Sequence, residues 1–480
     1  MTRFTFDAHE YNRDDTFSRA RYEFQGSEEE GWVVVRNGEN HLSLGPGHRL
    51  LRVLACGICS TDIARRFLPF PLPQILGHEV VATDPDRGGQ YVAEINDTCV
   101  ARGDIHPDPF CRAGLPTHCP ERMVLGIDRL PGGFGPFILA PVHAVIPADT
   151  LPLRTAALVE PFAAALHAVH VSRPQKGDRI AVLGVGRLGS LIIIALSAWR
   201  KSSGTDCSLT ALDLGRGRRK HALSLGADEA VDLDTVSSNR LKEEFDLVFD
   251  ASGSPSGLAT ALLLARREVH LKSTHGQPCF GLRHLTEMVV DEIALLPYSG
   301  DSLSFKWENE HRSNRTAYCA PGARTDEAAR GLTAFAGSIT EAAAHLSSGN
   351  LPGNLPRFDL GIASTAEEID GILRPLPSDE NSLVRPRGAI LVQGGNSDNP
   401  VLNFLASGRR IRTSRCGDFH QAMALLEGQP ALAEIMTERL ITHEAGEADL
   451  PRTFAKAREA DMLKVLIIHD DQPTPARMSG

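Results

Sequence analysis

Leu54-Ala-Cys-Gly-Ile-Cys-Ser-Thr-Asp62 is the stretch from which the rest of the chain can be interpreted. Cys59 offers a soft thiolate donor, and Gly77-His78-Glu79 adds an imidazole and a carboxylate further along. A catalytic zinc needs three protein ligands of this mixed kind and one open position for water or substrate. A lone cysteine and histidine at this separation are more often core residues. The Thr-Asp pair after the cysteine and the Gly-His-Glu motif together favour a metal site.

These motifs resemble those of the zinc-dependent medium-chain dehydrogenase/reductase family, in which a Gly-Ile-Cys-x-Ser/Thr-Asp segment precedes Gly-His-Glu. The resemblance covers residues 30 to 300 and again 400 to 470. It implies an α/β fold with a GroES-like β-rich catalytic domain and a Rossmann doubly wound parallel sheet. It also implies an NAD(P)-dependent zinc oxidoreductase that acts on an alcohol, polyol or sugar-like substrate.

Length and composition agree with this class. A chain of 480 residues, 42% of them hydrophobic, can build two cores. The formal net charge of -10 and the pI near 6.0 give no basic stripe that would indicate nucleic acid. We expect no membrane span, because no apolar run reaches about 18 residues. A start without an apolar core predicts the cytoplasm, where nine cysteines indicate ligands and reduced thiols.

The chain divides by pattern into domains. Residues 1–30 are charged and predict a solvated N-terminal extension. Short β-rich runs bounded by Gly and Pro then predict the GroES-like domain over 31–170. The Rossmann domain is expected over 171–300, and the chain returns to the catalytic domain over 419–480.

A cysteine-bearing segment lies inside the expected catalytic domain. The family often carries a four-cysteine structural zinc here, and Cys99, Cys111 and Cys119 match three of its ligands. The second cysteine is absent. Either His106 or Asp108 could complete a tetrahedron, because zinc accepts imidazole and carboxylate. The alternative is a decayed lobe with free thiols, and the sequence leaves both open.

Glu160 stands near the start of an apolar helix predicted over residues 156–170. Stabilisation by the helix dipole alone could explain its place there. The polyol, sugar and threonine dehydrogenase branch of the family has Glu-Pro at this point, as this chain does. The resemblance therefore implies that Glu160 either binds zinc or holds the metal-bound water, exchanging that role with Glu79.

Cofactor binding is predicted by a strand at 179–183 followed by Gly184-Val-Gly186-Arg-Leu-Gly189 and an apolar helix, which places a pyrophosphate on the helix N-terminus. A second strand ends at Asp213, where a carboxylate pairs with the ribose hydroxyls of NAD. Arg216, Arg218 and Arg219 lie just beyond and could bind a 2′-phosphate, so NAD is favoured and NADP stays open. The expected cofactor-binding residues are Gly184, Gly186, Arg187, Leu188, Gly189, Asp213, Arg218 and Lys464.

A large insertion is expected in or after the cofactor domain. Residues 301–356 predict a surface excursion with one helix over 326–346. Residues 357–418 then repeat a strand-helix-strand pattern, because Phe358-Asp-Leu-Gly-Ile-Ala363 echoes Phe245-Asp-Leu-Val-Phe-Asp250. We expect strands at 358–363 and 388–393 to join the cofactor-domain sheet. In the family the last strand of that sheet commonly pairs with a second subunit, so the insertion could alter a homodimer edge.

The expected chemistry is hydride transfer between a small alcohol or carbonyl substrate and NAD(P). Zinc would lower the pKa of the alcohol, Thr61 would carry its proton first, and Asp62 would orient a ligand such as His78. Ala64 stands where the family often has a histidine, so the proton needs another route. Two rival hypotheses are a silent dinucleotide-binding scaffold and a zinc-dependent lyase or hydrolase. The expected catalytic residues are Cys59, Thr61, Asp62, His78, Glu79 and Glu160.

Overall fold

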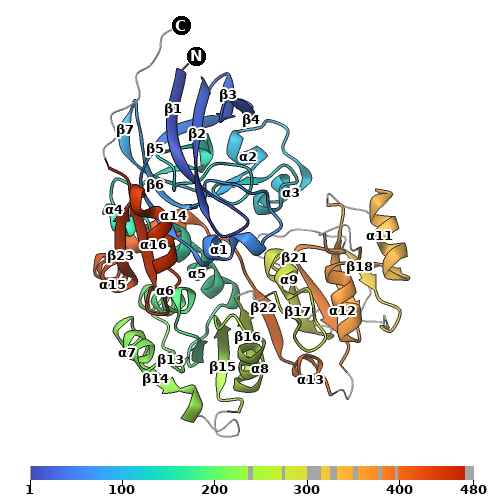
Figure 1. Ribbon diagram of the computed structural model, residues 1–480. Helices are drawn as coiled ribbons and strands as arrows, with labels where there is room; N and C mark the ends of the chain where they lie inside the picture. Colours follow the sequence, from blue (N-terminus) through green and yellow to red (C-terminus); the bar gives the residue numbers. More distant parts are fainter. Residues whose placement is uncertain are drawn as a thin grey trace. The chain divides into compact units, whose positions relative to one another are not determined.

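The structure is a computed structural model (Figure 1), which describes residues 2–235, 242–272, 276–299, 315–324, 332–349, 355–376, 381–394 and 398–470. These residues form two compact units, one of Met1–Ala163 with Asp418–Gly480 and the other of Ala164–Gly417. Among the described residues, no helix combines the length and the apolar character that a membrane crossing requires.

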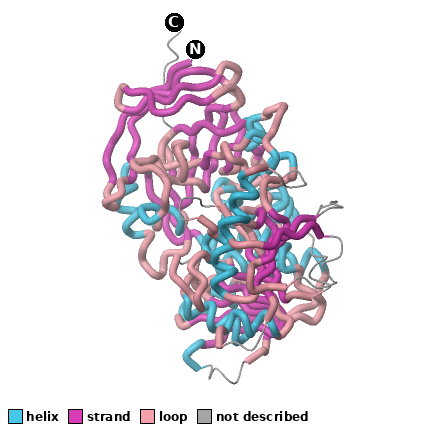
Figure 2. The backbone as a smooth tube through the Cα atoms, turned by 90° about the vertical axis from the view of Figure 1, so that its right-hand side faces the viewer, coloured by secondary structure: helices cyan, strands magenta, loops and turns pink. Residues whose placement is uncertain are grey.

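The first unit begins with a four-stranded antiparallel sheet whose strands pair in chain order. Its strands run as extended segments beside the N-terminus in Figure 2. They are β1 (Thr2–Tyr11), β2 (Phe17–Ser27), β3 (Gly31–Arg36) and β4 (Glu39–Leu44).

The prediction of a solvated extension over residues 1–30 is wrong. Alternate side chains along β1 and β2 are buried, among them Phe4, Phe6, Tyr22 and Phe24. This period of two is that of a strand with one covered face. Charged residues on the other face hid the pattern in the sequence.

A second sheet of seven strands carries the candidate catalytic residues. Cys59 directly follows β5, Glu79 opens β6 and Lys464 opens β24. Because β5 pairs with both β6 and β24, these three residues lie at one end of the sheet. The strands are β5 (His48–Ile58), β6 (Glu79–Asp84), β7 (Gly88–Ala93), β10 (Phe137–Pro141), β11 (Val145–Pro147), β23 (Ile441–Gly446) and β24 (Lys464–Ile468).

Short helices and a two-stranded sheet of β8 (Asn96–Asp97) and β9 (Met123–Val124) complete this unit. The helical segments are α1 (Ser60–Ile63), η1 (Arg65–Phe67), α2 (Cys99–Arg102), α3 (Pro109–Arg112), η2 (Pro116–His118), η3 (Val142–Ala144), α4 (Leu153–Ala156), α14 (Phe419–Gly428), α15 (Pro430–Leu440), η6 (Glu447–Asp449) and α16 (Leu450–Lys456). The start of α5 (Val159–Ser172) also belongs here.

The second unit is built on one eleven-stranded sheet in the order β14-β13-β12-β15-β16-β22-β17-β21-β20-β18-β19. Every neighbouring pair is parallel except β17 and β22, which are antiparallel. The strands are β12 (Arg179–Leu183), β13 (Ser208–Asp213), β14 (Glu229–Asp232), β15 (Phe245–Asp250), β16 (Ala265–Leu271), β17 (Ala294–Pro297), β18 (Arg315–Cys319), β19 (Leu332–Ala336), β20 (Phe358–Ala363), β21 (Val384–Val392) and β22 (Arg410–Thr413).

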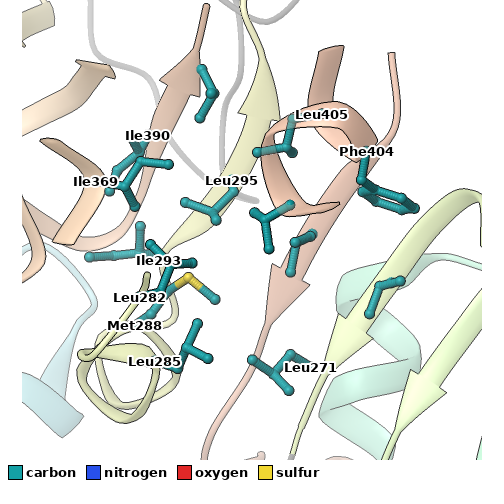
Figure 3. Close-up of a cluster of buried hydrophobic side chains, with 14 of the residues drawn as sticks. Leu271, Leu282, Leu285, Met288, Ile293, Leu295, Ile369, Ile390, Phe404 and Leu405 are labelled. Carbon is teal, nitrogen blue, oxygen red and sulfur yellow. The ribbon is translucent and has the colours of Figure 1, made fainter. Parts of the chain in front are cut away.

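Helices cover this sheet and bury an apolar core, as strands of a parallel sheet require on both faces. Figure 3 shows part of the core, where Leu271 of β16, Leu295 of β17 and Ile390 of β21 face one cluster. The helices are α6 (Arg187–Ser203), α7 (Arg216–Ser224), η4 (Leu233–Thr235), α8 (Pro255–Leu264), α9 (Leu285–Val290), α11 (Ile339–Ser347), α12 (Ala366–Leu373) and α13 (Pro400–Ala406).

The segment after residue 300 differs from its prediction in two ways. A surface excursion is wrong for its described part, because β18 and β19 are strands of the main sheet. The helix predicted over 326–346 is also wrong in part, since residues 332–336 form β19 and helix α11 begins at Ile339. Residues 326–331 lie outside the described ranges. Alanine-rich sequence favours a helix in isolation, but pairing with β18 overrides that preference here.

The repeated unit expected over 357–418 has its strands in this sheet. Residues 358–363 form β20 and residues 388–392 fall in β21, which pair with each other in parallel. Within the same range, residues 410–413 form β22, which lies beside β16.

Candidate active site and metal centre

The first candidate site gathers side chains from the ends of three strands and from two helices, α1 and α5, and we call it the strand-end site. Its members are Cys59, Asp62, His78, Glu79, Glu160 and Lys464. All belong to the first unit. Asp62, His78, Glu79 and Lys464 are buried, and Cys59 is partly exposed.

Asp62 organises the site in the way that the sequence suggested. One carboxylate oxygen accepts from the backbone N–H of Cys59 at 2.8 Å, and the other lies 3.3 Å from Nδ1 of His78. Burial lowers the pKa of His78, but the charges of Asp62 and Cys59 outweigh it and raise that pKa well above its ordinary value. Asp62 therefore orients the imidazole from behind, as outer carboxylates do for metal-binding histidines.

Lys464 and Glu79 form a buried ion pair in this site. The Lys464 ammonium lies 2.5 Å and 2.6 Å from the two carboxylate oxygens of Glu79. Lys464 was expected to bind the cofactor, but in the structure its ammonium group donates to Glu79. Gly57 makes room for this pair, because a Cβ there would lie 1.9 Å from Oε2 of Glu79.

Glu160 lies in the first turn of helix α5, where the charges of His78, Glu79, Lys464 and Asp62 act on it. Burial raises the pKa of Glu160 to about 7, and the neighbouring charges of Glu79 and Asp62 act in the same direction. Three carboxylates and a thiol therefore meet one ammonium, Lys464, and one imidazole. A thiolate, an imidazole and a carboxylate are the donors that zinc takes, and a divalent cation would balance the excess negative charge.

Thr61 lies beside Cys59, with its hydroxyl oxygen 3.7 Å from the Cys59 sulfur. Arg65, one turn further on, is fully buried and was missed by sequence reasoning. Its guanidinium donates to the carbonyl oxygens of Phe70, Pro71 and Ile127 at 2.7–3.3 Å. Arg65 therefore ties two loops to the segment that carries Cys59. An arginine outside any regular motif gave no signal of this role.

The second candidate site is the cysteine lobe, formed by Cys99 at the start of α2, Asp108 and Cys111 at α3, and Cys119 beyond it. One ligand atom from each of these four residues lies within 4.8 Å of all the others, the one such group in the described residues. The Cys99 sulfur lies 2.9 Å from Oδ2 of Asp108 and 4.0 Å from the Cys119 sulfur. His106 is not in the group. The structure thus brings the three sulfurs together and places Asp108 as the fourth donor.

Asp108 has a second task in the lobe. Its other oxygen, Oδ1, accepts from the backbone N–H groups of Phe110 and Cys111 and so caps helix α3. Burial raises the pKa of Cys119 to about 11. Thiols so hard to ionise call for a bound cation if they are to act as thiolates.

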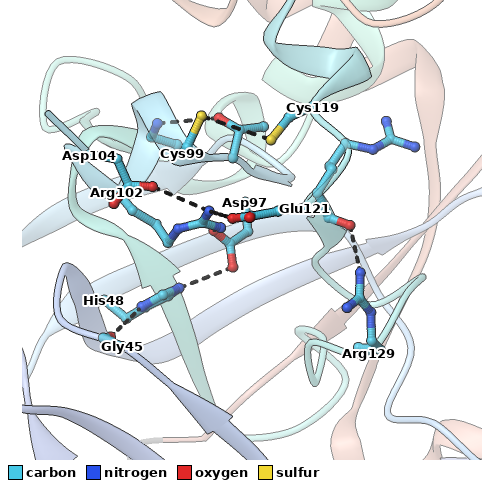
Figure 4. A network of polar contacts seen from close by, with 12 residues as sticks. Gly45, His48, Asp97, Cys99, Arg102, Asp104, Cys119, Glu121 and Arg129 are labelled. Carbon is cyan, nitrogen blue, oxygen red and sulfur yellow. Dashed lines mark hydrogen bonds and ion pairs between the residues drawn. The ribbon is translucent and has the colours of Figure 1, made fainter. Parts of the chain in front are cut away.

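Charged residues support the lobe from below (Figure 4). Asp97 accepts from Arg102 at 2.8 Å and lies 3.0 Å from Nε2 of His48. Asp97 and His48 are almost fully buried, so this network fixes helix α2 and, through it, Cys99.

The glycine motif of the second unit has the form expected for a dinucleotide. Gly184 takes a left-handed conformation with φ of +89°, and a Cβ on Gly189 would lie 1.8 Å from the carbonyl oxygen of Gly184. A Cβ on Gly186 would meet nothing within 4 Å, so the turn is open at that point. Arg187 and Leu188 then begin helix α6. The motif provides the tight turn and the close approach that a pyrophosphate needs.

Asp213 ends β13 beside this turn. Its carboxylate accepts from the backbone N–H groups of Val185 at 2.8 Å and Gly215 at 2.7 Å. A carboxylate has about four acceptor positions, so Asp213 can still accept from ribose hydroxyls. Arg218 lies 3.8 Å from it, whereas Arg219 pairs with Asp232.

Known proteins resemble this chain in amino-acid sequence over part of its length. Residues 45–150 match the alcohol dehydrogenase GroES-like domain. The chain is 29% identical over 245 residues to L-galactonate-5-dehydrogenase of Escherichia coli (strain K12), covering 46% of this chain and 67% of that protein. It is 30% identical over 237 residues to D-arabinitol dehydrogenase 1 of Uromyces fabae, covering 45% and 65%. The chain thus spans about two thirds of the length of these curated relatives.

Solved structures resemble the whole chain at lower identity. L-idonate 5-dehydrogenase from Escherichia coli K-12 gives a TM-score of 0.54 at 15% identity, covering 98% of this chain and 100% of that one. An alcohol dehydrogenase from Thermotoga maritima gives a TM-score of 0.53 at 15% identity, covering 97% and 100%. At this level of identity the likeness concerns the fold alone.

Proposed function

This chain belongs to the zinc-dependent medium-chain dehydrogenase family, and on that premise we propose that it transfers a hydride between an alcohol and a nicotinamide dinucleotide. The observation that carries the proposal is the strand-end site, where Cys59 and His78 lie beside each other and His78, Glu79 and Glu160 act on one another through their charges, in surroundings with an excess of negative charge. Such a donor set suits zinc with an open position.

Cys59, His78 and Glu160 would hold the zinc ion. When bound, the ion supplies positive charge that stabilises a negative substrate oxygen. Glu79 is the less suitable third ligand, because both of its oxygens contact Lys464. Lys464 and Glu79 then form a fixed ion pair beside the ligands, and Asp62 holds His78 in orientation.

Thr61 would move the substrate proton. Its hydroxyl both accepts and donates, and it lies next to the Cys59 sulfur. Ala64 removes the imidazole that family members often use for the next transfer. The proton would therefore pass from Thr61 to a cofactor ribose hydroxyl or to water.

The second unit would bind NAD. The Gly184–Gly189 turn would hold the pyrophosphate, and the nicotinamide would accept or give the hydride. Asp213 lies at the end of β13 and favours ribose hydroxyls over a 2′-phosphate by charge, so NAD is proposed over NADP.

A hydroxyl-rich secondary alcohol is the proposed substrate class. Two curated relatives are named for an aldonate and a pentitol, respectively. Glu160-Pro161 in place of a cysteine ligand also resembles the polyol branch. The cysteine lobe would hold a second, structural zinc through Cys99, Asp108, Cys111 and Cys119.

The test combines metal analysis with a substrate screen on the full chain. Zinc per chain is measured by mass spectrometry, and reduction of NAD and NADP is followed by absorbance with polyols, aldonates, threonine and simple alcohols. We expect two zinc ions and NAD reduction with a polyol or aldonate. Cys59→Ser should lose one zinc and the activity, while Cys207→Ser, a buried thiol far along the chain, should lose neither. Full turnover in Cys59→Ser would overturn the proposal.

A further inference from the structure

Chain order and spatial order disagree in the middle of the large sheet. β17 follows β16 directly in the chain, yet it lies beside β21 and β22. β22 follows β21 directly in the chain, yet it lies beside β16. Each of the two central strands has therefore crossed to the other side of the sheet. Figure 1 shows β22 between β16 and β17.

The strands on the two sides follow one plan. Outward from the centre, one side runs β16, β15, β12, β13, β14 and the other runs β21, β20, β18, β19. On both sides the order is the last strand, the one before it, then the first and the second. Among the described residues, the second side has no counterpart of β14. This order is that of a doubly wound nucleotide-binding sheet.

The polar contacts on the two sides also correspond. Asp246, the second residue of β15, pairs with Arg266 of β16 at 2.6 Å and accepts from the backbone N–H of Arg179 at the start of β12. Asp359, the second residue of β20, pairs with Arg385 of β21 at 2.8 Å.

Asp359 also accepts from the backbone N–H of Thr316 near the start of β18, at 2.8 Å. Asp246 therefore connects β15, β16 and β12, and Asp359 connects the corresponding strands β20, β21 and β18. A register shift follows Phe245 in one pair and Phe358 in the other, again at the same place. The strand order, the aspartate contacts and the register shifts therefore all indicate that the two sides are repeats of one unit.

The two sides meet as two copies related by a two-fold axis would meet. β17 and β22 are antiparallel, with Leu295 opposite Ile411. Like edges that pair antiparallel are the mark of an isologous interface. Here both edges come from one chain.

We propose that residues 285–413 contain a second copy of the nucleotide-binding fold whose last strand is exchanged with that of the first copy. The second copy occupies the edge that a second chain would otherwise cover. An edge strand presents unpaired N–H and C=O groups that recruit another strand. β22 has a neighbour on both sides, so no second copy of this chain pairs with it.

Polar contacts lock the exchanged strands. Glu292, just before β17, contacts Arg387 of β21 at 2.6 Å and accepts from the backbone N–H of Arg415 after β22 at 2.7 Å. Thr413 of β22 donates to the carbonyl oxygen of Ile293 at 3.0 Å. The apolar core of Figure 3 runs through the same junction without a break. The two copies therefore form one cooperative body.

A carboxylate lies in the described part of the second copy's crevice. Ligands in such sheets bind where the strand order reverses, between β12 and β15 in the first copy and between β18 and β20 in the second. In the described part of the second crevice, Glu368 accepts from the backbone N–H groups of Gly322 and Ser364, both at 2.7 Å. Its carboxylate therefore already accepts from one backbone N–H of the turn after β18, which is the counterpart of the turn that follows β12. One dinucleotide per chain is therefore expected.

Paired cysteines at the junction test the exchange in the full chain. Facing residues of antiparallel strands have Cα atoms about 4.5–5.5 Å apart, within the span of a disulfide. Leu295→Cys with Ile411→Cys is oxidised after mixing nitrogen-15-labelled and unlabelled protein, with each single variant as control. We expect a linked peptide pair in which both peptides carry the same isotope. Linked pairs of mixed isotope, or a folded double variant with no link between positions 295 and 411, would overturn the proposal.

Hydrogen exchange of the unaltered protein provides a second test that needs no variant. As denaturant rises, the amides of β15 and β16 should open together with those of β20 and β21. Opening of β18 to β21 as a separate unit, with β12 to β16 still protected, would contradict the proposal. Titration with NADH adds the stoichiometry, where one site per chain is expected and two would contradict that expectation.

Discussion

The strand-end site and the cysteine lobe both gather donors that suit zinc, but they do so in opposite ways. Residues of the strand-end site come from positions as far apart as Cys59 and Lys464, and buried charges hold them in place. The lobe draws all four of its donors from residues 99–119, and turns and short helices hold them. Donors of the first site thus stand at the ends of strands that have their own pairing, whereas those of the second join turns within one short segment. We therefore expect loss of the first to affect chemistry and loss of the second to affect stability.

The largest expected effect is on turnover after Cys59→Ser. Loss of outer partners of a metal site costs about 10–100-fold, and loss of a direct ligand should cost more. Stability should change little, because β5 keeps its pairing with β6 and β24. Steady-state kinetics and thermal unfolding check both. Cys111→Ser is the matched control and should show the reverse pattern. Equal loss of activity in the two variants would break the comparison.

The next effect is on folding. Lys464→Met leaves Glu79 as a buried charge without its partner, and breaking such a pair costs about 3–5 kcal/mol of unfolding free energy. Denaturant titration measures it. Lys464→Met combined with Glu79→Gln should recover most of the loss, because no charge is then buried alone. If the single variant is as stable as the parent chain, the ion pair does not hold the site.

A smaller effect is expected on metal affinity. Asp62→Asn keeps a side-chain oxygen for the N–H of Cys59 but removes the charge facing His78. Zinc affinity at the strand-end site should fall by about 10–100-fold, as for other outer partners. Competition with a chromogenic chelator separates the two zinc ions. The zinc of the lobe should be unaffected, and an equal drop at both sites would contradict the separation.

The smallest effect distinguishes the two tasks of Asp108. Asp108→Asn keeps a helix-capping residue, whereas Asp108→Ala loses the cap, worth about 1 kcal/mol. With zinc removed by a chelator, only the alanine variant should lose stability in urea. With zinc present, both should bind it more weakly than the parent chain. Equal stability of the two metal-free variants would show that the cap contributes nothing.

The zinc and nucleotide motifs could be predicted from the sequence, because the residues of each motif lie close together in the chain. Cys59-Ser-Thr61-Asp62 and Gly184–Gly189 each lie in one turn, so short-range order places them. The partner of Glu79 could not be found this way, since Lys464 reaches it through the pairing of β5 with β24. The sequence of β5 does not predict that β24, roughly 400 residues later, will pair with it.

The N-terminal sheet shows a different limit. Strands β1 and β2 alternate Phe and Tyr with charged residues, and the acidic run at 28–30 outweighed that pattern. The repeated unit over 357–418 was visible because Phe358-Asp-Leu repeats Phe245-Asp-Leu. Its first two strands, β18 and β19, carry no such echo, and only the sheet reveals them.

The exchange of strands also determines how long the edge of β16 stays unpaired while the chain is synthesised. β16 ends at Leu271, but its neighbour β22 begins at Arg410, roughly 140 residues later. At about 5–20 residues per second, the ribosome leaves the edge of β16 open for roughly 7–28 s. The first copy cannot complete its sheet until the second has been made, so a ribosome that stalls before residue 410 releases a chain with an unpaired central edge. Nascent chains of this protein should therefore depend on chaperones until β22 emerges.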